Sequence, residues 1–377
     1  EEPEQIVFEE ESKENEILPE DMIADDSQMQ TEPTEPPVMV DEQIAQALSE
    51  MKLGAEDYLS LMNGLSSVAK EVQNSVVNVV GVTSDVSWLV NEYENEGVVS
   101  GVVVADNGRE LLVLANISTI LDAESLKVIF ADENEYEASI KRMDHNTGYA
   151  VLAISKDTMK SGTLSMAKAV SLGTSGGSSL VGVSVIAIGR PMGTDGSMCY
   201  GMITSVSGNV ELPDSSYKYM TTDIYGSSSA SGILINLRGQ VLGMIDMTYN
   251  APDMKNIISA IGISDLKKVM ESLSNDKDIA YFGVYGVDVT GEANEEMQVP
   301  YGAYITEIDM DSPAMTAGIQ SGDVIVMIDE TEITNYQDLV KTLFFYEPED
   351  EVKITFMRQG PDGYTEMETD AVLGIKK

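Results

Sequence analysis

The sequence contains very few of the side chains that build reactive centres. Its 377 residues include one histidine, one cysteine and one tryptophan. A lone cysteine, Cys199, excludes an internal disulfide. One histidine and one cysteine cannot supply the ligands of a zinc site, and the acidic runs lack the ligand spacing of a calcium loop. We therefore expect no metal and no cofactor.

Basic residues are also scarce, since 22 Lys and Arg stand against 64 Asp and Glu, for a formal net charge of −42. A surface this acidic repels phosphate, so no nucleic-acid partner is expected and anionic lipid headgroups are disfavoured. No apolar run reaches the roughly 18 residues of a membrane span. Because the chain begins at Glu1 and not at Met, a signal or membrane anchor upstream of it stays open.

The first 74 residues divide into two parts. Residues 1–40 are acidic, carry five prolines and have little apolar content, so we expect a disordered tail. Residues 41–74 carry apolar side chains at helical spacing, which predicts an amphipathic helical segment, either one helix or two broken near Gly54. The apolar stripe needs a partner, either the next domain or a second copy of the chain.

Short β-branched runs replace the helical period from Ser75 onward, as in Val76–Val82 and Val98–Val104. Two successive sets of such runs, separated by turn residues, predict a mostly β fold of two small barrels or a sandwich. Ser264 is expected to cap the helix that follows. The predicted parts are the tail 1–40, the helical segment 41–74, the β unit 75–263, a linker helix 264–279 and a second β-rich unit 280–374.

Several segments of the first β unit stand in a distinctive order and spacing. The segments are Leu111–Ala123, Asp144–Ile154, Val185–Gly193, Gly201–Ser205, Thr222–Asp223 with Ser228–Asn236, and Gly239–Gly243. In order and spacing they resemble segments of the HtrA/Deg-like trypsin-fold serine proteases. The resemblance implies a trypsin-like double β-barrel over 75–263, with a serine, histidine and aspartate triad in active members.

The last unit resembles a PDZ domain of the HtrA arrangement, because Asp311–Ile325 matches its pattern nearly throughout. The resemblance implies that an extended peptide adds as a strand beside Gly283–Val289. Helix 335–345 would form the other groove wall, where two leucines either line a pocket or belong to the core. The peptide-binding candidates are Tyr281, Phe282, Gly283 and Val284, whose loop would hold the peptide carboxylate, together with Leu339 and Leu343.

The family's triad positions fall on Ser118, Gly148 and Ala230. Proteolysis by a triad needs a hydroxyl nucleophile, an imidazole base and a carboxylate that orients the imidazole. A serine hydroxyl is no base near neutral pH, glycine has no side chain, and alanine has no nucleophile. A shift of one residue would place Ser229 or Ser231 at the nucleophile position but would restore no histidine. We therefore predict no catalytic residue.

The other polar residues near these positions are expected to be structural. His145, the only histidine, lies on the loop of the acid position, so we expect an exposed residue and not a general base. Ser228 and Ser231 stand where the family has glycine, which favours a filled turn over an oxyanion pocket. Asp144 and Asp223 are expected to bond to the backbone.

The function hypothesis is therefore a pseudoprotease. Its PDZ domain would capture C-terminal or unfolded peptide segments, and its barrels would scaffold or regulate at a bacterial cell envelope, with an anchor in the membrane. Two alternatives stay open: an active serine endopeptidase of protein quality control with an unusual site, and a regulatory subunit of active HtrA-like protomers. The resemblance also implies a homotrimer formed through the protease domain.

Overall fold

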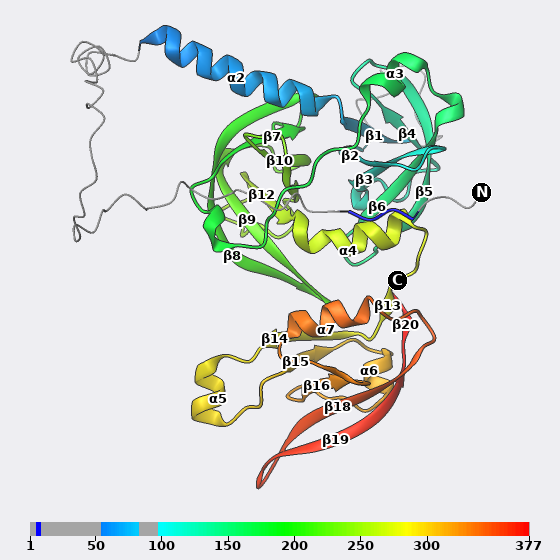
Figure 1. Cartoon of the computed structure of the whole chain (residues 1–377), viewed down its shortest axis with the longest axis vertical. Coiled ribbons are helices and arrows are strands. Elements are labelled where there is room, and N and C mark those ends of the chain that lie inside the picture. Colours follow the sequence, from blue (N-terminus) through cyan, green and yellow to red (C-terminus); the bar gives the residue numbers. More distant parts are fainter. Residues whose placement is uncertain (1–4, 9–53, 83–96, 377) are drawn as a thin grey trace, which may run out of the picture.

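The computed structural model describes residues 5–8, 54–82 and 97–376 of the chain (Figure 1). Within these ranges the strands form two closed six-stranded barrels followed by a third, open sheet. The predicted fold class is confirmed, and the sandwich alternative is wrong. The predicted tail 1–40, apart from residues 5–8, and residues 41–53 of the helical segment lie outside the described residues.

Helix α2 (Ala55–Gln73) begins directly after Gly54, where the helical pattern is interrupted. The Asp57 carboxylate accepts the Gly54 N–H at 2.8 Å, which satisfies one free amide of the first turn. Near its C-terminal end, Val68 and Val72 of the apolar stripe pack against the core cluster shared by the barrels, so part of the stripe packs on the next domain as expected. No described helix combines the length and the apolarity that crossing a bilayer requires.

The strands of the first barrel follow the order β1-β2-β3-β6-β5-β4. The barrel interior takes alternate side chains such as Leu111 and Val113, and the intervening Leu112 is buried in the core cluster shared by both barrels. Short helices η1 (Ser118–Ile120), η2 (Lys156–Thr158) and α3 (Ser161–Met166) accompany it. Its strands are β1 (Val76–Val82), β2 (Val98–Asp106), β3 (Glu110–Asn116), β4 (Ser125–Ile129), β5 (Glu135–Met143) and β6 (Tyr149–Ser155).

The second barrel closes in the order β10-β11-β12-β9-β8-β7. One apolar core cluster takes side chains from both barrels, so they pack against each other through Leu114 of the first and Ile188 of the second. The strands are β7 (Ser184–Gly189), β8 (Ser197–Leu212), β9 (Ser215–Tyr225), β10 (Gly232–Asn236), β11 (Val241–Ile245) and β12 (Ile257–Gly262), with η3 (Ser178–Leu180) before β7.

Helix α4 (Ile263–Ser274) links the barrels to the last unit. The expectation that Ser264 caps it is wrong, because the N-cap is Gly262 and no side chain caps the helix. Ser264 lies inside the first turn, where its Oγ accepts the Ser175 N–H at 2.9 Å. The helix buries its apolar face on the barrels, through Leu266, Val269, Met270 and Leu273.

The C-terminal unit is a sheet in the order β14-β15-β16-β18-β19, with β17 paired to β16, and its helix α7 lies within the predicted range 335–345. Figure 1 shows the β8–β9 hairpin reaching out of the second barrel to β14 and α7. The elements are β13 (Ala280–Tyr281), β14 (Val284–Asp288), α5 (Gly291–Met297), β15 (Ala303–Ile308), α6 (Pro313–Thr316), β16 (Val324–Ile328), β17 (Thr331–Glu332), α7 (Tyr336–Leu343), β18 (Glu351–Gly360), β19 (Gly363–Val372) and β20 (Gly374–Ile375).

Candidate functional site

Two of the three predicted triad positions, Ser118 and Gly148, lie in direct contact. Ser118 follows β3 and Gly148 precedes β6, and these strands pair through Asn116 and Tyr149. The Ser118 hydroxyl donates to Asn116 Oδ1 at 2.7 Å. A Cβ added at Gly148, where φ is 76°, would lie 1.8 Å from Ser118 Oγ. The serine hydroxyl therefore fills the space that a side chain at position 148 would need.

Asn116 also joins the two barrels, a role that the sequence does not indicate. Its Nδ2 donates to the Thr147 carbonyl at 3.1 Å and to Asp246 Oδ2 at 3.2 Å. Asp246 is 4% exposed and follows β11 of the second barrel. The Asn116 position is part of a segment that carries the family resemblance, but its partner is 130 residues away. Only the folded arrangement identifies this bond.

The segment at the nucleophile position is a turn closed by its own hydrogen bonds. The Ala230 N–H donates to the Ser227 carbonyl at 3.1 Å, and Ala230 is 7% exposed. The hydroxyls of Ser227 and Ser229 lie 2.9 Å apart. Ser231 Oγ accepts the N–H of Ser100, on β2 of the first barrel, at 2.9 Å. The Ala230 amide and both neighbouring hydroxyls thus have protein partners within or beside the turn.

The loop between β5 and β6 holds the only histidine, His145, which is exposed. The neighbouring Asp144 is 1% exposed and accepts the Asn146 N–H at 3.2 Å. Asp223 accepts the Met202 N–H at 2.7 Å. The predicted backbone bonds of the two aspartates are confirmed.

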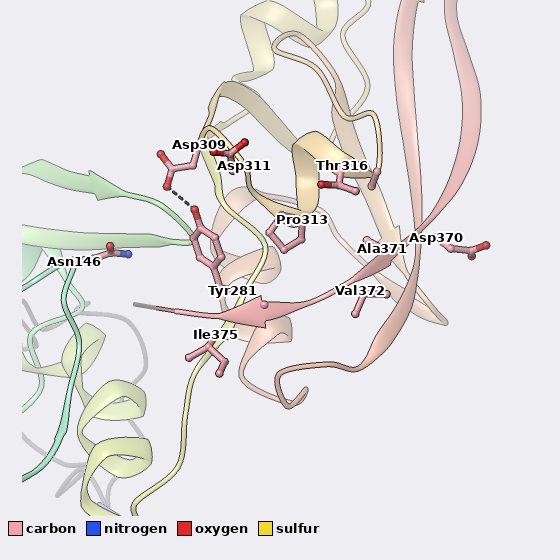
Figure 2. Close-up of a pocket in the computed structure, with 12 residues that line it drawn as sticks. Asn146, Tyr281, Asp309, Asp311, Pro313, Thr316, Asp370, Ala371, Val372 and Ile375 are labelled. Atoms are coloured by element: carbon pink, nitrogen blue, oxygen red, sulfur yellow. Dashed lines mark hydrogen bonds between the residues drawn. The ribbon is translucent and has the colours of Figure 1, made fainter.

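In the C-terminal unit, residues 281–284 form the loop that precedes β14, here called the carboxylate loop. Gly283 has a φ of 86°, and a Cβ there would lie 2.3 Å from Ser312 Cβ. The Tyr281 hydroxyl donates to Asp309 Oδ2 at 2.6 Å (Figure 2). Tyr281 also lines a pocket of about 630 Å³ together with Asn146 of the first barrel and Pro313 of α6. These contacts fix the shape of the loop.

The three loop amides converge on one carboxylate, which belongs to Asp214. The N–H groups of Phe282 and Gly283 donate to Asp214 Oδ2 at 2.8 Å, and the N–H of Val284 donates to Oδ1 at 3.0 Å. In return, the Asp214 N–H donates to the Val284 carbonyl at 2.8 Å. The PDZ resemblance assigns these amides to a peptide carboxylate, and nothing in the sequence points to Asp214 as their partner.

Asp214 is 4% exposed. Burial raises the pKa of its carboxyl, and the loop amides and the Lys376 ammonium act in the opposite direction by stabilising the charge. Lys376 is itself buried, and its Nζ donates to Ser215 Oγ. The carboxylate loop therefore holds an acidic side chain in a dry environment with a nearby counter-charge.

Helix α7 lies against β14 on the other side of the expected groove. The Tyr336 hydroxyl donates to the Val284 carbonyl at 2.9 Å, and Gln337 Nε2 donates to the Ser216 carbonyl of β9 at 3.0 Å. Leu339 and Leu343, at 0% and 2% exposed, belong to the core cluster of this unit. In this structure the two leucines are therefore core residues, and the start of β9 lies against α7.

Comparison with known proteins supports this reading of both units. A family profile described as a trypsin-like peptidase domain matches residues 99–244, and one described as a PDZ domain matches residues 281–369. The serine protease Do-like HtrA of Lactococcus lactis subsp. cremoris is 26% identical over 335 residues, which are 78% of this chain and 80% of the relative. The serine protease Do-like HtrA of Bacillus subtilis is 28% identical over 293 residues, which are 72% of this chain and 63% of the relative.

Solved structures show the same fold. The HtrA-type protease AlgW with a decapeptide has 21% identity and a TM-score of 0.58, with 82% of this chain and 98% of that chain covered. The serine endoprotease from Yersinia pestis has 21% identity and a TM-score of 0.55, with 82% of this chain and 97% of that chain covered. The two barrels, the open C-terminal sheet and these matches together show a trypsin-like peptidase domain followed by a PDZ domain, the arrangement in which this chain is similar to the HtrA-type proteases.

Proposed function

We propose that this chain is a non-catalytic HtrA-like protein that binds C-terminal or unfolded peptide segments through its PDZ domain. The observation that carries the proposal is the convergence of the Phe282, Gly283 and Val284 amides on a single carboxylate. Such an arrangement of N–H donors matches the α-carboxylate of a peptide. The solved AlgW complexes with a tripeptide and a decapeptide support the same ligand class.

The absence of catalysis rests on the chemistry of the triad positions. Ser118 supplies no base, and its hydroxyl occupies the space beside Gly148 where an acid would have to lie. The Ala230 amide, which would have to stabilise an oxyanion, already donates within its own turn. Loss of a single triad member already costs several orders of magnitude in rate, so three absent groups leave no route for acyl transfer.

We place this activity at a bacterial cell envelope, with the barrels as the platform for the PDZ domain. Relatives from Halomonas elongata and Pseudomonas fulva are described as probable periplasmic serine endoproteases, which supports an extracytoplasmic position. A membrane anchor upstream of this chain and assembly into a homotrimer belong to the same proposal.

Incubation with unfolded casein tests the non-catalytic part. We expect no cleavage products from the chain or from its Ser229→Ala and Ser231→Ala variants, under conditions where an active HtrA-type protease degrades the substrate. Casein cleavage that is lost on either substitution would instead establish the serine endopeptidase alternative.

A matched pair of glycine substitutions tests the peptide-binding part. Gly283→Ala places a Cβ against Ser312 at a positive φ, whereas Gly291→Ala places one in open space at the start of α5. The probes are fluorescent decapeptides with a free C-terminal carboxylate, selected for binding from a pool randomised at the last four positions. We expect Gly283→Ala to abolish their binding and Gly291→Ala to leave it unchanged; equal binding by both variants would contradict the proposal.

A further inference from the structure

The β8–β9 hairpin delivers its turn into the carboxylate loop. Strands β8 and β9 remain paired up to Leu212 and Ser215, so Pro213 and Asp214 form a two-residue turn, here called the hairpin tip. Proline fixes its φ near −65°, and Asp214 has a φ of 53°, a left-handed conformation that aspartate tolerates better than most residues. The local sequence thus suits a sharp turn that presents a carboxylate.

The tip makes the same two kinds of contact as the last residue of a bound peptide. A peptide that adds to the edge of β14 has a carboxylate for the loop amides and a backbone N–H for a strand carbonyl. Asp214 satisfies all three loop amides and donates its own N–H to Val284. The difference is that this carboxylate lies on a side chain within the same polypeptide.

Contacts from three other segments hold the tip in place. Asn146 Nδ2, on the β5–β6 loop, donates to the Pro213 carbonyl at 3.4 Å. Gln337 of α7 donates to the Ser216 carbonyl two residues beyond the tip. Lys376 stabilises the negative charge of Asp214 and donates to Ser215. The tip is therefore docked by contacts from the first barrel and from two parts of the PDZ domain.

We infer that Asp214 is an internal ligand of the PDZ carboxylate loop, so that a peptide terminus binds only after the hairpin tip has left. The inference rests on the proposed peptide-binding function. Two carboxylates cannot share three N–H donors, because each would lose hydrogen bonds and the two charges would repel each other in a buried site. Asp214 therefore lowers the apparent affinity of the intact chain for every ligand with a free α-carboxylate.

Asp214 competes with the peptide for the loop amides while it is tethered to the same chain, and this sets how far it weakens peptide binding. A tethered group acts at an effective concentration in the millimolar range, and the apparent Kd is the intrinsic Kd divided by the binding-competent fraction. An occupied fraction of about 90% or more corresponds to an apparent Kd raised about tenfold or more. Removal of the Asp214 carboxylate should therefore tighten peptide binding by at least about tenfold.

The test compares Asp214→Gly, Asp214→Asn and the intact chain as full-length proteins. Glycine accepts the positive φ and removes the carboxylate, and asparagine keeps the shape but removes the charge. Asp253→Asn, at an exposed position of the β11–β12 loop, is the control for a change of one charge. The probes are the fluorescent decapeptides with a free carboxylate, selected on each protein separately, and the same peptides as C-terminal amides.

We expect the affinity for free-carboxylate peptides to follow the order Asp214→Gly, Asp214→Asn, and then the intact chain and Asp253→Asn together. The amidated peptides should bind none of the four proteins tightly. Equal, carboxylate-dependent binding by all four would overturn the inference and leave the proposed function intact. If no protein prefers the free carboxylate, the proposed function fails.

Amide hydrogen exchange at residues 282–284 provides a readout that needs no peptide. In the intact chain and in Asp253→Asn these amides should exchange slowly, because all three are hydrogen-bonded to Asp214. In Asp214→Gly they should exchange at least about tenfold faster, while the buried amides of β10 remain protected and show that the barrels are folded. Unchanged protection in both Asp214 variants would overturn the internal-ligand assignment, whatever the peptides do.

Discussion

At the scale of single residues, Gly148 and Ser118 form a contacting pair at the positions that the family resemblance aligns with the acid and the base. The Cβ that any other residue would add at 148 meets the Ser118 hydroxyl. Gly108 has a similarly positive φ of 86° but open space around its missing Cβ. The two glycines therefore separate the effect of backbone strain from the effect of a steric clash.

We expect Gly148→Ala to reduce the free energy of unfolding by about 1–3 kcal/mol more than Gly108→Ala does, because overpacking adds to the strain. Adding Ser118→Ala should recover most of this difference, since the closest clash of the added Cβ, at 1.8 Å, is with the hydroxyl oxygen, and the next, with Asn116 Oδ1, is at 2.8 Å. Urea denaturation of the single and double variants measures the coupling. If the double variant is as unstable as the sum of the single ones, Ser118 does not fill the acid position.

The sequence could identify a site residue only where its hydrogen-bond partners lie close to it along the chain. Gly283 and the loop amides lie within one short segment, so the resemblance of that segment to a PDZ domain was enough to predict a carboxylate site there. Asp214 lies 68 to 70 residues from the amides that it contacts, and nothing in a Pro-Asp turn indicates that partner. The Ser264 cap was wrong for a related reason, since the serine bonds to Ser175, 89 residues away.

At the scale of elements, residues 5–8 show how a short stretch of chain can stabilise a helix. The Ile6 N–H donates to Asn275 Oδ1 at 2.8 Å, and Asn275 Nδ2 donates to the Ile6 carbonyl at 2.7 Å. Phe8 is 8% exposed and packs into the core cluster shared by the barrels, whereas Val7 is 68% exposed. The segment lies along α4 and covers part of its C-terminal end (Figure 1).

Truncation of these side chains should therefore have unequal effects. Phe8→Ala should cost about 2–4 kcal/mol of unfolding free energy, because it removes a buried aromatic ring. Val7→Ala should change the same quantity by less than about 0.5 kcal/mol, as expected of an exposed residue. Urea denaturation measures both, and equal effects would mean that residues 5–8 do not pack on α4.

The strands were more predictable than their arrangement. Alternating β-branched runs indicated short strands, and the family resemblance indicated two barrels in place of a sandwich. Neither the strand pattern nor the family resemblance predicted how long the β8–β9 hairpin is. Its pairing continues from the barrel to Leu212 and Ser215, beyond the last resembling segment of β8 at Gly201–Ser205. The outer part of the β8–β9 hairpin, which reaches the PDZ domain, could therefore not be predicted from the sequence.

At the scale of the whole molecule, buried tyrosines lie in the barrels and at their junction with the PDZ domain. Tyr149, Tyr217 and Tyr219 are at most 8% exposed, and Tyr336 is 2% exposed. Burial is the main cause that raises the pKa of each of these phenols, and nearby carboxylates raise it further. Their folded pKa values therefore lie above the unfolded value of about 10.

A raised folded pKa means that the associated stability is complete below about pH 10 and is lost as the pH rises through the folded pKa values. We expect alkaline unfolding in which exposed tyrosines ionise first and the buried ones ionise together with the loss of structure. Phenolate absorbance and far-ultraviolet circular dichroism, recorded during one titration, would test this. Ionisation of all 16 tyrosines with unchanged circular dichroism would contradict the assigned burial.

The most direct test of the whole account is the intact mass of the chain after prolonged incubation with a serine-reactive fluorophosphonate. Because Ala230 carries no nucleophile and the sole histidine, His145, is an exposed residue of the β5–β6 loop, we predict an unchanged mass, while an active HtrA-type protease in the same tube is fully labelled. A stoichiometric adduct that tandem mass spectrometry locates on Ser229 or Ser231 would contradict the account and identify a working nucleophile.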